Sequence, residues 1–166
     1  IAQINPDANI VVAPSDHLIL KEDAFVEAIN SCYTKATSKD CLVTLGIQPA
    51  RPDTGYGYIQ FVESETNESD SNIKKVKTFT EKPDLEMAKF FLQSGDFLWN
   101  AGIFIWSAKS IINAFEKHEP EMAAIFSEGN SVYNTAEEST FLKTAYANCK
   151  NISIDYAVME KADNVY

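Results

Sequence analysis

The sequence has few cysteines and little positive charge. Its three cysteines, Cys32, Cys41 and Cys149, form no CxxC pair and no spacing typical of a metal site. A count that is both sparse and odd is typical of a reducing compartment and predicts a cytoplasmic protein. The 14 Lys and Arg residues stand against 24 Asp and Glu residues, for a formal net charge of −10. This balance disfavours a nucleic-acid backbone or an anionic membrane surface as a partner.

Long hydrophobic runs are missing as well. No apolar stretch is long enough to cross a bilayer, and no signal-peptide pattern is present, so the sequence predicts no membrane partner. The hydrophobic fraction of 45% and the charged fraction of 23% are ordinary for a globular protein. A length of 166 residues favours one domain, or most of one.

Short apolar runs alternate with helical patterns along the chain. Strand patterns cover residues 10–13, 41–47, 55–62, 74–80 and 102–106. Helices are expected over residues 21–36, after the candidate N-caps Asp84 and Ser107, after Thr135, and from Ile154 to about Lys161. The polar stretch 64–72 is typical of a mobile hairpin connection. This alternation predicts an α/β fold, with a mixed, mostly parallel sheet and flanking helices.

The first strand ends in the motif PSDH, which places Asp16 at a strand end. In open α/β sheets ligands bind outside the carboxyl ends of the strands, where an Asp can hold a divalent metal. An Asx turn, or the cap of the next helix, would explain the same residue without any ligand.

Two motifs near the middle of the chain also lie beside strand ends. In TGYGY (residues 54–58) Gly57 would let a backbone approach a ligand closely, although a bulge or turn also favours glycine. In EKP (residues 81–83) Glu81 can accept hydrogen bonds from sugar hydroxyls and Lys82 can neutralise a phosphate. The structural alternative is an exposed charged turn before a helix.

Two motifs in the second half have similar alternatives. In WNAG (residues 99–102) Asn100 offers both donors and an acceptor to a sugar hydroxyl, or serves as a turn residue. In SIDYAVMEK (residues 153–161) Asp155 falls in the first turn of the last predicted helix. A carboxylate there is stabilised by the helix dipole, and it can equally present an oxygen to a metal.

The order of these motifs resembles the sugar-1-phosphate nucleotidyltransferases, and within them the mannose-1-phosphate guanylyltransferase group. PSDH, TGYGYI, FTEKP, WNAGIF and SIDYAVMEK follow one another, and the resemblance extends from Pro6 to Lys161. It implies the Rossmann-like nucleotide-diphospho-sugar transferase fold. It also implies a reaction in which the phosphate of mannose 1-phosphate attacks the α-phosphorus of GTP and pyrophosphate leaves, so the expected partners are GTP and mannose 1-phosphate.

The resemblance further implies a role for each motif residue. Asp16 and Asp155 would be the ligands of a catalytic Mg²⁺, whose octahedral shell suits two carboxylates with substrate phosphates and water. Lys82 would act in catalysis by orienting the attacking sugar phosphate. The residues expected to bind the sugar phosphate are Gly57, Glu81, Lys82 and Asn100.

The chain departs from the family pattern at its start. The resemblance implies a first strand and a Gly-rich loop that hold the nucleotide, and nothing in residues 1–13 resembles them. We therefore expect residues 1–166 to be a single, partial nucleotidyltransferase domain that lacks the N-terminal nucleotide-binding segment, is incomplete at both ends and is inactive alone. The sheet edge left by the missing strand would favour a homo-oligomer.

Three alternatives remain open at this point. Another sugar-1-phosphate nucleotidyltransferase would use UTP or dTTP with glucose 1-phosphate, because the expected base-reading residues lie mostly in the segment that is not seen. A catalytically silent regulatory module would keep the fold without binding Mg²⁺ or sugar phosphate. A metal-dependent glycosyltransferase of similar layering ranks last, because the sequence shows no recognisable Asp-x-Asp motif.

Overall fold

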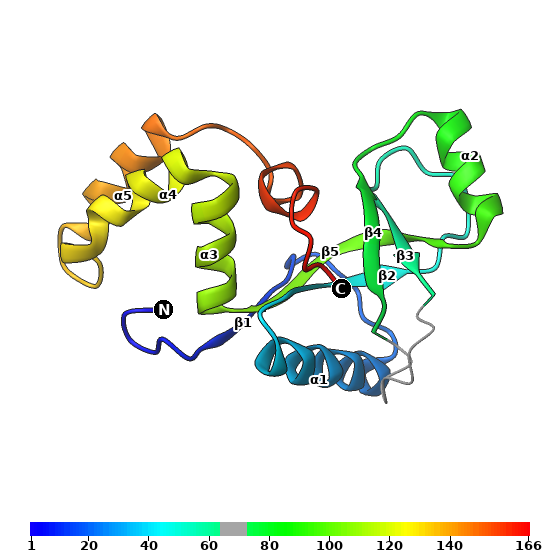
Figure 1. Cartoon of the computed structure of the whole chain (residues 1–166), viewed down its shortest axis with the longest axis horizontal. Helices are drawn as coiled ribbons and strands as arrows, with labels where there is room; N and C mark the ends of the chain where they lie inside the picture. Colours follow the sequence, from blue (N-terminus) through cyan, green and yellow to red (C-terminus); the bar gives the residue numbers. More distant parts are fainter. Residues whose placement is uncertain (64–72) are drawn as a thin grey trace. The chain divides into compact units, whose positions relative to one another are not determined.

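The computed structural model describes residues 1–63 and 73–166, which form two compact units (Figure 1). Unit 1 comprises residues 1–111 together with 163–166, and unit 2 comprises residues 112–162. The predicted hairpin connection, residues 64–72, lies outside the described residues. The expectation of one partial domain over residues 1–166 stays a prediction.

Unit 1 is built on a five-stranded sheet whose central strand is β5 (Phe97–Ser107). The other strands are β1 (Asn9–Val12), β2 (Leu42–Ile47), β3 (Tyr58–Val62) and β4 (Lys75–Thr80). The strand order is β1-β5-β3-β4, and β2 also pairs with β5. β2 pairs with both halves of β5, whereas β1 pairs only with its C-terminal half and β3 only with its N-terminal half.

The α/β class with flanking helices is confirmed, but the strand directions differ from those expected. The four ladders described between these strands are antiparallel, so the sheet is not mostly parallel. It is still mixed, because Leu42 forms a parallel bridge with Val165. β1 and β2 do run in the same direction, as a strand–helix–strand pattern predicts, since both are antiparallel to β5. Strand β5, from much later in the chain, lies between them. Pairing between residues so far apart in the sequence cannot be predicted from local sequence patterns.

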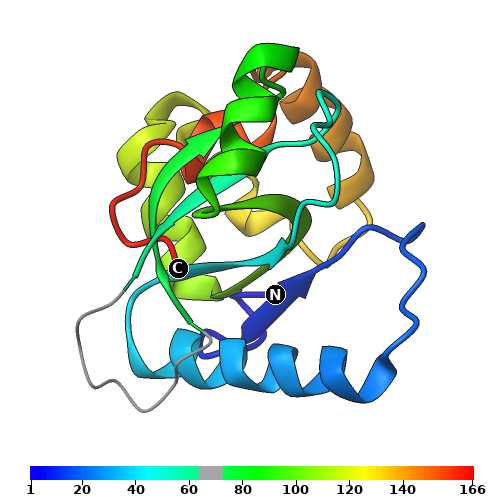
Figure 2. The same cartoon turned by 90° about the vertical axis from the view of Figure 1, so that its right-hand side faces the viewer.

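Helix α1 (Glu22–Ser38) joins β1 to β2 and runs along the sheet (Figure 2). Its buried residues Cys32 and Ala36 share a core cluster with Val43 of β2 and with Ile103 and Ile105 of β5. Burial of this apolar stripe holds the helix against the strands.

Helix α2 (Leu85–Ser94) begins at the predicted N-cap. The Asp84 carboxylate accepts a hydrogen bond from the Met87 N–H at 2.8 Å, and Gly95 ends the helix with a φ of +81°. Phe91 of α2 stacks on Phe97 at a ring distance of 4.0 Å, in a cluster with the fully buried Tyr58. The chain that carries TGYGY is therefore anchored in the core by Tyr58.

Helix α3 (Ala108–His118) follows β5, and the predicted cap is confirmed, because the Ser107 hydroxyl accepts the Ser110 N–H at 2.9 Å. Unit 2 begins within α3, at Ile112, and contains α4 (Pro120–Ser127), the 3₁₀ turn η1 (Glu128–Ser131), α5 (Glu138–Asn148) and the π-helical turn η2 (Asp155–Met159). Among the described residues no helix has the length and apolar character that crossing a membrane requires.

Two local predictions in unit 2 are wrong in detail. Thr135 does not cap α5; its hydroxyl accepts the Glu137 N–H at 3.2 Å in a turn before the helix, whose N-cap is Glu137 itself. That turn needs Asn134 in the left-handed region, at a φ of +62°. The last predicted helix forms only the single π turn η2.

Candidate functional site

Gly57 lies between two of the other predicted site residues, at the start of β3. Its carbonyl oxygen accepts the Asn100 N–H at 2.8 Å, and Tyr58 pairs with Thr80 on β4, one residue before Glu81. Residues directly opposite on neighbouring strands point to the same face of a sheet. Accordingly, a Cβ added to Gly57 would meet the Glu81 carboxylate and would lie 3.5 Å from the Asn100 Cβ. We call this small space between Gly57, Glu81 and Asn100 the Gly57 notch.

Space, not backbone conformation, explains the glycine in the notch. The described glycines with positive φ are Gly95 and Gly102, so Gly57 has a backbone conformation open to other residues. What a side chain at Gly57 would take away is the room between the Glu81 carboxylate and Asn100. Such room beside polar side chains suits a close approach by a ligand.

Glu81 and Lys82 place an acceptor and a positive charge next to the notch. The Glu81 side chain is 12% exposed and that of Lys82 is 64% exposed, with Nζ 3.7 Å from Glu81 Oε1. Lys82 has a φ of +46°, a left-handed conformation that turns the chain between β4 and α2. A largely buried carboxylate can accept hydroxyl hydrogens, and an exposed ammonium can meet a phosphate.

Asn100 is held by two hydrogen bonds to its side-chain oxygen. Oδ1 accepts the Gly102 N–H at 3.1 Å and the Thr44 hydroxyl of β2 at 3.0 Å. The sequence had singled out Asn100 but gave no sign of Thr44, because β2 pairs with β5 only in the folded chain.

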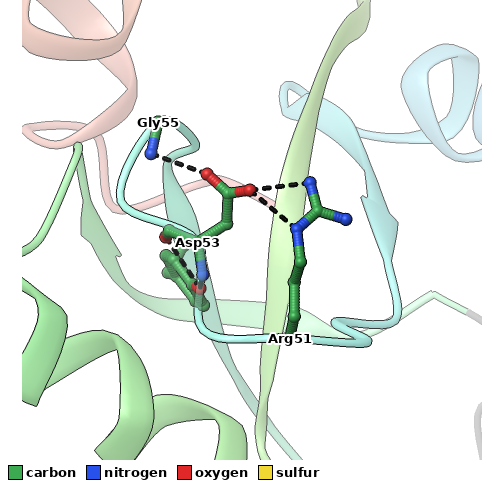
Figure 3. A network of polar contacts seen from close by, with 4 residues as sticks. Arg51, Asp53 and Gly55 are labelled. Carbon is green, nitrogen blue, oxygen red and sulfur yellow. Dashed lines mark hydrogen bonds and ion pairs between the residues drawn. The ribbon is translucent and has the colours of Figure 1, made fainter.

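The loop that precedes Gly57 is fastened by Asp53 (Figure 3). The Asp53 carboxylate accepts the Gly55 N–H at 2.8 Å and the Arg51 guanidinium at 2.7 and 3.1 Å. The buried Tyr58 hydroxyl accepts the Asp53 N–H and donates to the Asp53 carbonyl, both at 3.0 Å. The Gly55 N–H, together with Arg51, lowers the pKa of Asp53, which keeps the carboxylate ionised at neutral pH.

Arg51 also reaches the other face of β5. Its guanidinium lies over the Trp99 ring, 5.4 Å from the centroid, and the Tyr56 ring lies 5.1 Å from the same ring. These contacts tie the loop to Trp99, the neighbour of Asn100, and so fix the loop from the side opposite the notch. The only sequence signal for this arrangement was the Arg-x-Asp spacing before TGYGY.

Asp16 lies in an exposed turn after β1. A Cβ added to Gly102, which has a φ of +67°, would lie 3.6 Å from the Pro14 Cγ. The loop of the PSDH motif therefore passes beside the Asn100–Gly102 segment, so the structure brings the loop of Asp16 close to the residues of the notch.

Asp155 is the first residue of η2 and is half-buried. Its carbonyl accepts the Glu160 N–H at 2.9 Å, a π-type bond, and π turns often occur at functional sites. Asp155 belongs to unit 2 and Asp16 to unit 1, so their pairing on one metal stays a prediction. In the described part of the chain no group of three or more His, Cys, Asp or Glu side chains gathers as a metal site.

The lysine of the SIDYAVMEK motif has a structural partner within unit 2. Lys161 Nζ donates to Glu119 Oε1 at 2.5 Å, and Lys150 Nζ lies 3.8 Å from the other carboxylate oxygen. Glu119 is only 8% exposed, and the hydrogen bond from Lys161 lowers its pKa. This ion pair ties the segment after η2 to the start of α4.

Comparison with known proteins gives a consistent family. The model of the nucleotidyl transferase family matches residues 1–146. A mannose-1-phosphate guanylyltransferase of Sinorhizobium fredii is 38% identical over 162 residues, covering 95% of this chain and 30% of that protein.

Two solved structures have the same fold as the chain. One, described as a mannose-1-phosphate geranyltransferase from Thermus thermophilus, has a TM-score of 0.82 and 29% identity, covering 99% of this chain and 45% of that one. The other, described as a mannose-6-phosphate isomerase from Helicobacter pylori, has a TM-score of 0.76 and 28% identity, covering 96% of this chain and 60% of that one. The chain spans about a third of the length of the curated relatives it matches.

Proposed function

The chain belongs to the nucleotidyl transferase family, and from that membership we propose that it serves guanylyl transfer from GTP to mannose 1-phosphate, forming GDP-mannose and pyrophosphate. The chain spans only part of its relatives, so the activity is proposed for the native protein that contains it. Within that protein we assign this chain the binding of the sugar phosphate and a share of the metal ligands.

The observation that carries the proposal is the Gly57 notch. An acceptor at Glu81, an amide at Asn100 and the space left by Gly57 suit the hydroxyls of a sugar ring. The exposed ammonium of Lys82 beside Glu81 suits the phosphate on that sugar. Gly57, Glu81 and Lys82 lie at strand ends of unit 1, and Asn100 lies beside Gly57 on the neighbouring strand β5, which supports one common ligand.

The proposed chemistry needs alignment more than proton transfer. An oxygen of the sugar phosphate forms a bond to the α-phosphorus of GTP, and the bond from that phosphorus to the oxygen bridging it to the β-phosphorus breaks, so pyrophosphate takes the electron pair. The nucleophile is already ionised, so no side chain has to remove a proton. Glu81 and Asn100 would orient the sugar, while Lys82 would hold the phosphate oxygen in line and offset its charge.

The proposed metal ligands are Asp16 and Asp155, because Mg²⁺ is commonly bound by one or two carboxylates together with substrate phosphates. When bound, the ion would neutralise phosphate charge during the transfer. The proposed location is the cytoplasm, because the three cysteines are free. The net charge of −10 supports small-molecule partners over nucleic acid. Self-association through a sheet edge stays a proposal.

The names of the relatives favour mannose and guanine over the alternative pair, UTP or dTTP with glucose 1-phosphate. The direct test incubates the native protein with Mg²⁺ and each pair of substrates, and separates nucleotide sugars by chromatography. We expect GDP-mannose and pyrophosphate from GTP with mannose 1-phosphate, and little product from the other pairs. Product only from UTP or dTTP would favour the alternative enzyme. No product from any pair, together with no sugar-phosphate binding, would favour a silent module.

A further inference from the structure

We propose that Thr44 is a positioning residue that, together with the Gly102 N–H, holds the Asn100 side chain in the one rotamer that meets the sugar; this inference rests on the proposed function. Thr44 lies on β2, is 9% exposed and belongs to none of the motifs that point to the site. Its role follows from the chemistry of the hydrogen bonds around Asn100.

The Gly102 N–H determines the orientation of the amide. A backbone N–H can only donate, and the Asn100 atom at 3.1 Å from it is the side-chain oxygen. Turning the amide over would set the NH₂ group against this N–H, donor against donor. Oδ1 must therefore face Gly102, and the NH₂ group is directed away from it.

Thr44 adds the second constraint on the same oxygen. Its hydroxyl lies 3.0 Å from Asn100 Oδ1 and 3.3 Å from the Ile103 carbonyl, and both of these atoms are acceptors. The hydroxyl therefore serves as a donor here, and of the two acceptors that can take its single hydrogen Asn100 Oδ1 is the nearer. With two donors on Oδ1, the amide keeps one rotamer, whereas one donor alone would allow it to rock about the Gly102 bond.

The consequence for a ligand is a definite polarity across the Gly57 notch. In the proposed arrangement the Asn100 amide would present N–H donors to the sugar and Glu81 would present carboxylate acceptors, on either side of the space at Gly57. A sugar phosphate would match this pair with one hydroxyl that accepts and another that donates. Loss of the Thr44 hydroxyl would weaken this match without touching the ligand itself.

The test compares Thr44→Val and Thr44→Ser in the native protein. Valine keeps the shape of threonine and removes the donor, so we expect the KM for mannose 1-phosphate to rise roughly three- to tenfold, the net effect typical of one hydrogen bond. The KM for GTP should change less than twofold, and Thr44→Ser should restore the sugar-phosphate KM. Thr37→Val, which removes a hydroxyl bonded within α1, is the matched control and should leave both KM values unchanged.

A double-mutant cycle with Asn100→Ala separates positioning from general stability. If Thr44 acts through Asn100, Thr44→Val should add no further change in sugar-phosphate affinity, measured by titration with mannose 1-phosphate, once Asn100 is alanine. An equal loss in both backgrounds, or no loss in either, would overturn the role of Thr44. Failure of the unsubstituted native protein to bind mannose 1-phosphate would instead overturn the proposed function, and this inference with it.

Discussion

Gly57→Ala is expected to lower kcat/KM for mannose 1-phosphate by roughly two orders of magnitude, the effect of displacing a substrate by about 1 Å. The added methyl group would occupy the Gly57 notch and push the Glu81 carboxylate aside. The carboxylate is the far end of a flexible side chain, and the backbone of Gly57 accepts other residues, so the fold should survive. Steady-state kinetics with varied mannose 1-phosphate, and circular dichroism for the fold, would measure both effects.

Gly55→Ala is the matched control for this prediction. It adds the same methyl group to the same loop, where the Cβ would lie 3.2 Å from the Asp53 Oδ1 and away from the notch. We expect Gly55→Ala to retain activity within a few-fold of the unsubstituted protein. Full activity in Gly57→Ala would show that the notch does not hold the sugar.

Asp155→Asn is expected to reduce kcat by roughly a hundredfold or more while the protein stays folded. Mutation of a residue that only hydrogen-bonds to a metal ligand already lowers metal affinity or activity by about tenfold to a hundredfold, and loss of a ligand should lower it at least as much. Asparagine keeps the size of the side chain and an oxygen atom but removes the charge that attracts a divalent cation. The Mg²⁺ concentration that gives half-maximal binding of the metal, measured by isothermal titration, should rise accordingly.

Glu160→Gln is a suitable companion variant, because it neutralises an exposed carboxylate in the same motif. Its Mg²⁺ affinity and its kcat should stay close to those of the unsubstituted protein. If Asp155→Asn behaved like Glu160→Gln, Asp155 would have no place among the metal ligands.

Local features of the fold were predictable from the sequence. Asp84 caps α2 as its side chain and position suggest, and the apolar spacing before Ala36 gave α1 to within a few residues. These predictions succeed because caps and amphipathic faces depend on residues close together in the chain.

Features that depend on distant strands were not predictable. β5 begins at Phe97, five residues before the predicted strand, and buries Phe97 and Trp99 in alternation with Leu98 and Asn100. This alternation of buried and half-buried side chains is typical of a strand and shows that Asn100 lies within β5. The WNAG motif alone had suggested a turn at Asn100. The antiparallel pairing around β5 likewise depends on contacts between residues far apart in sequence.

The candidate site shows the same division. Motif resemblance selected Gly57, Glu81, Lys82 and Asn100. The strand register explains why Gly57, Glu81 and Asn100 share one face of the sheet. Thr44 holds Asn100 through a bond between residues 56 apart in the sequence, and Asp53, bonded to Arg51 and Gly55, holds the loop before Gly57. Motif resemblance thus selected the residues expected to meet a ligand, but not those that support them.

The most direct test of the central claim is a titration of the isotope-labelled native protein with mannose 1-phosphate in the presence of Mg²⁺, followed by nuclear magnetic resonance. If the Gly57 notch binds the sugar phosphate, the largest shifts should fall on the backbone amides of Gly57, Glu81 and Lys82 and on the side-chain amide of Asn100. Saturable binding with shifts confined to other parts of the chain, and none at these four residues, would contradict the account.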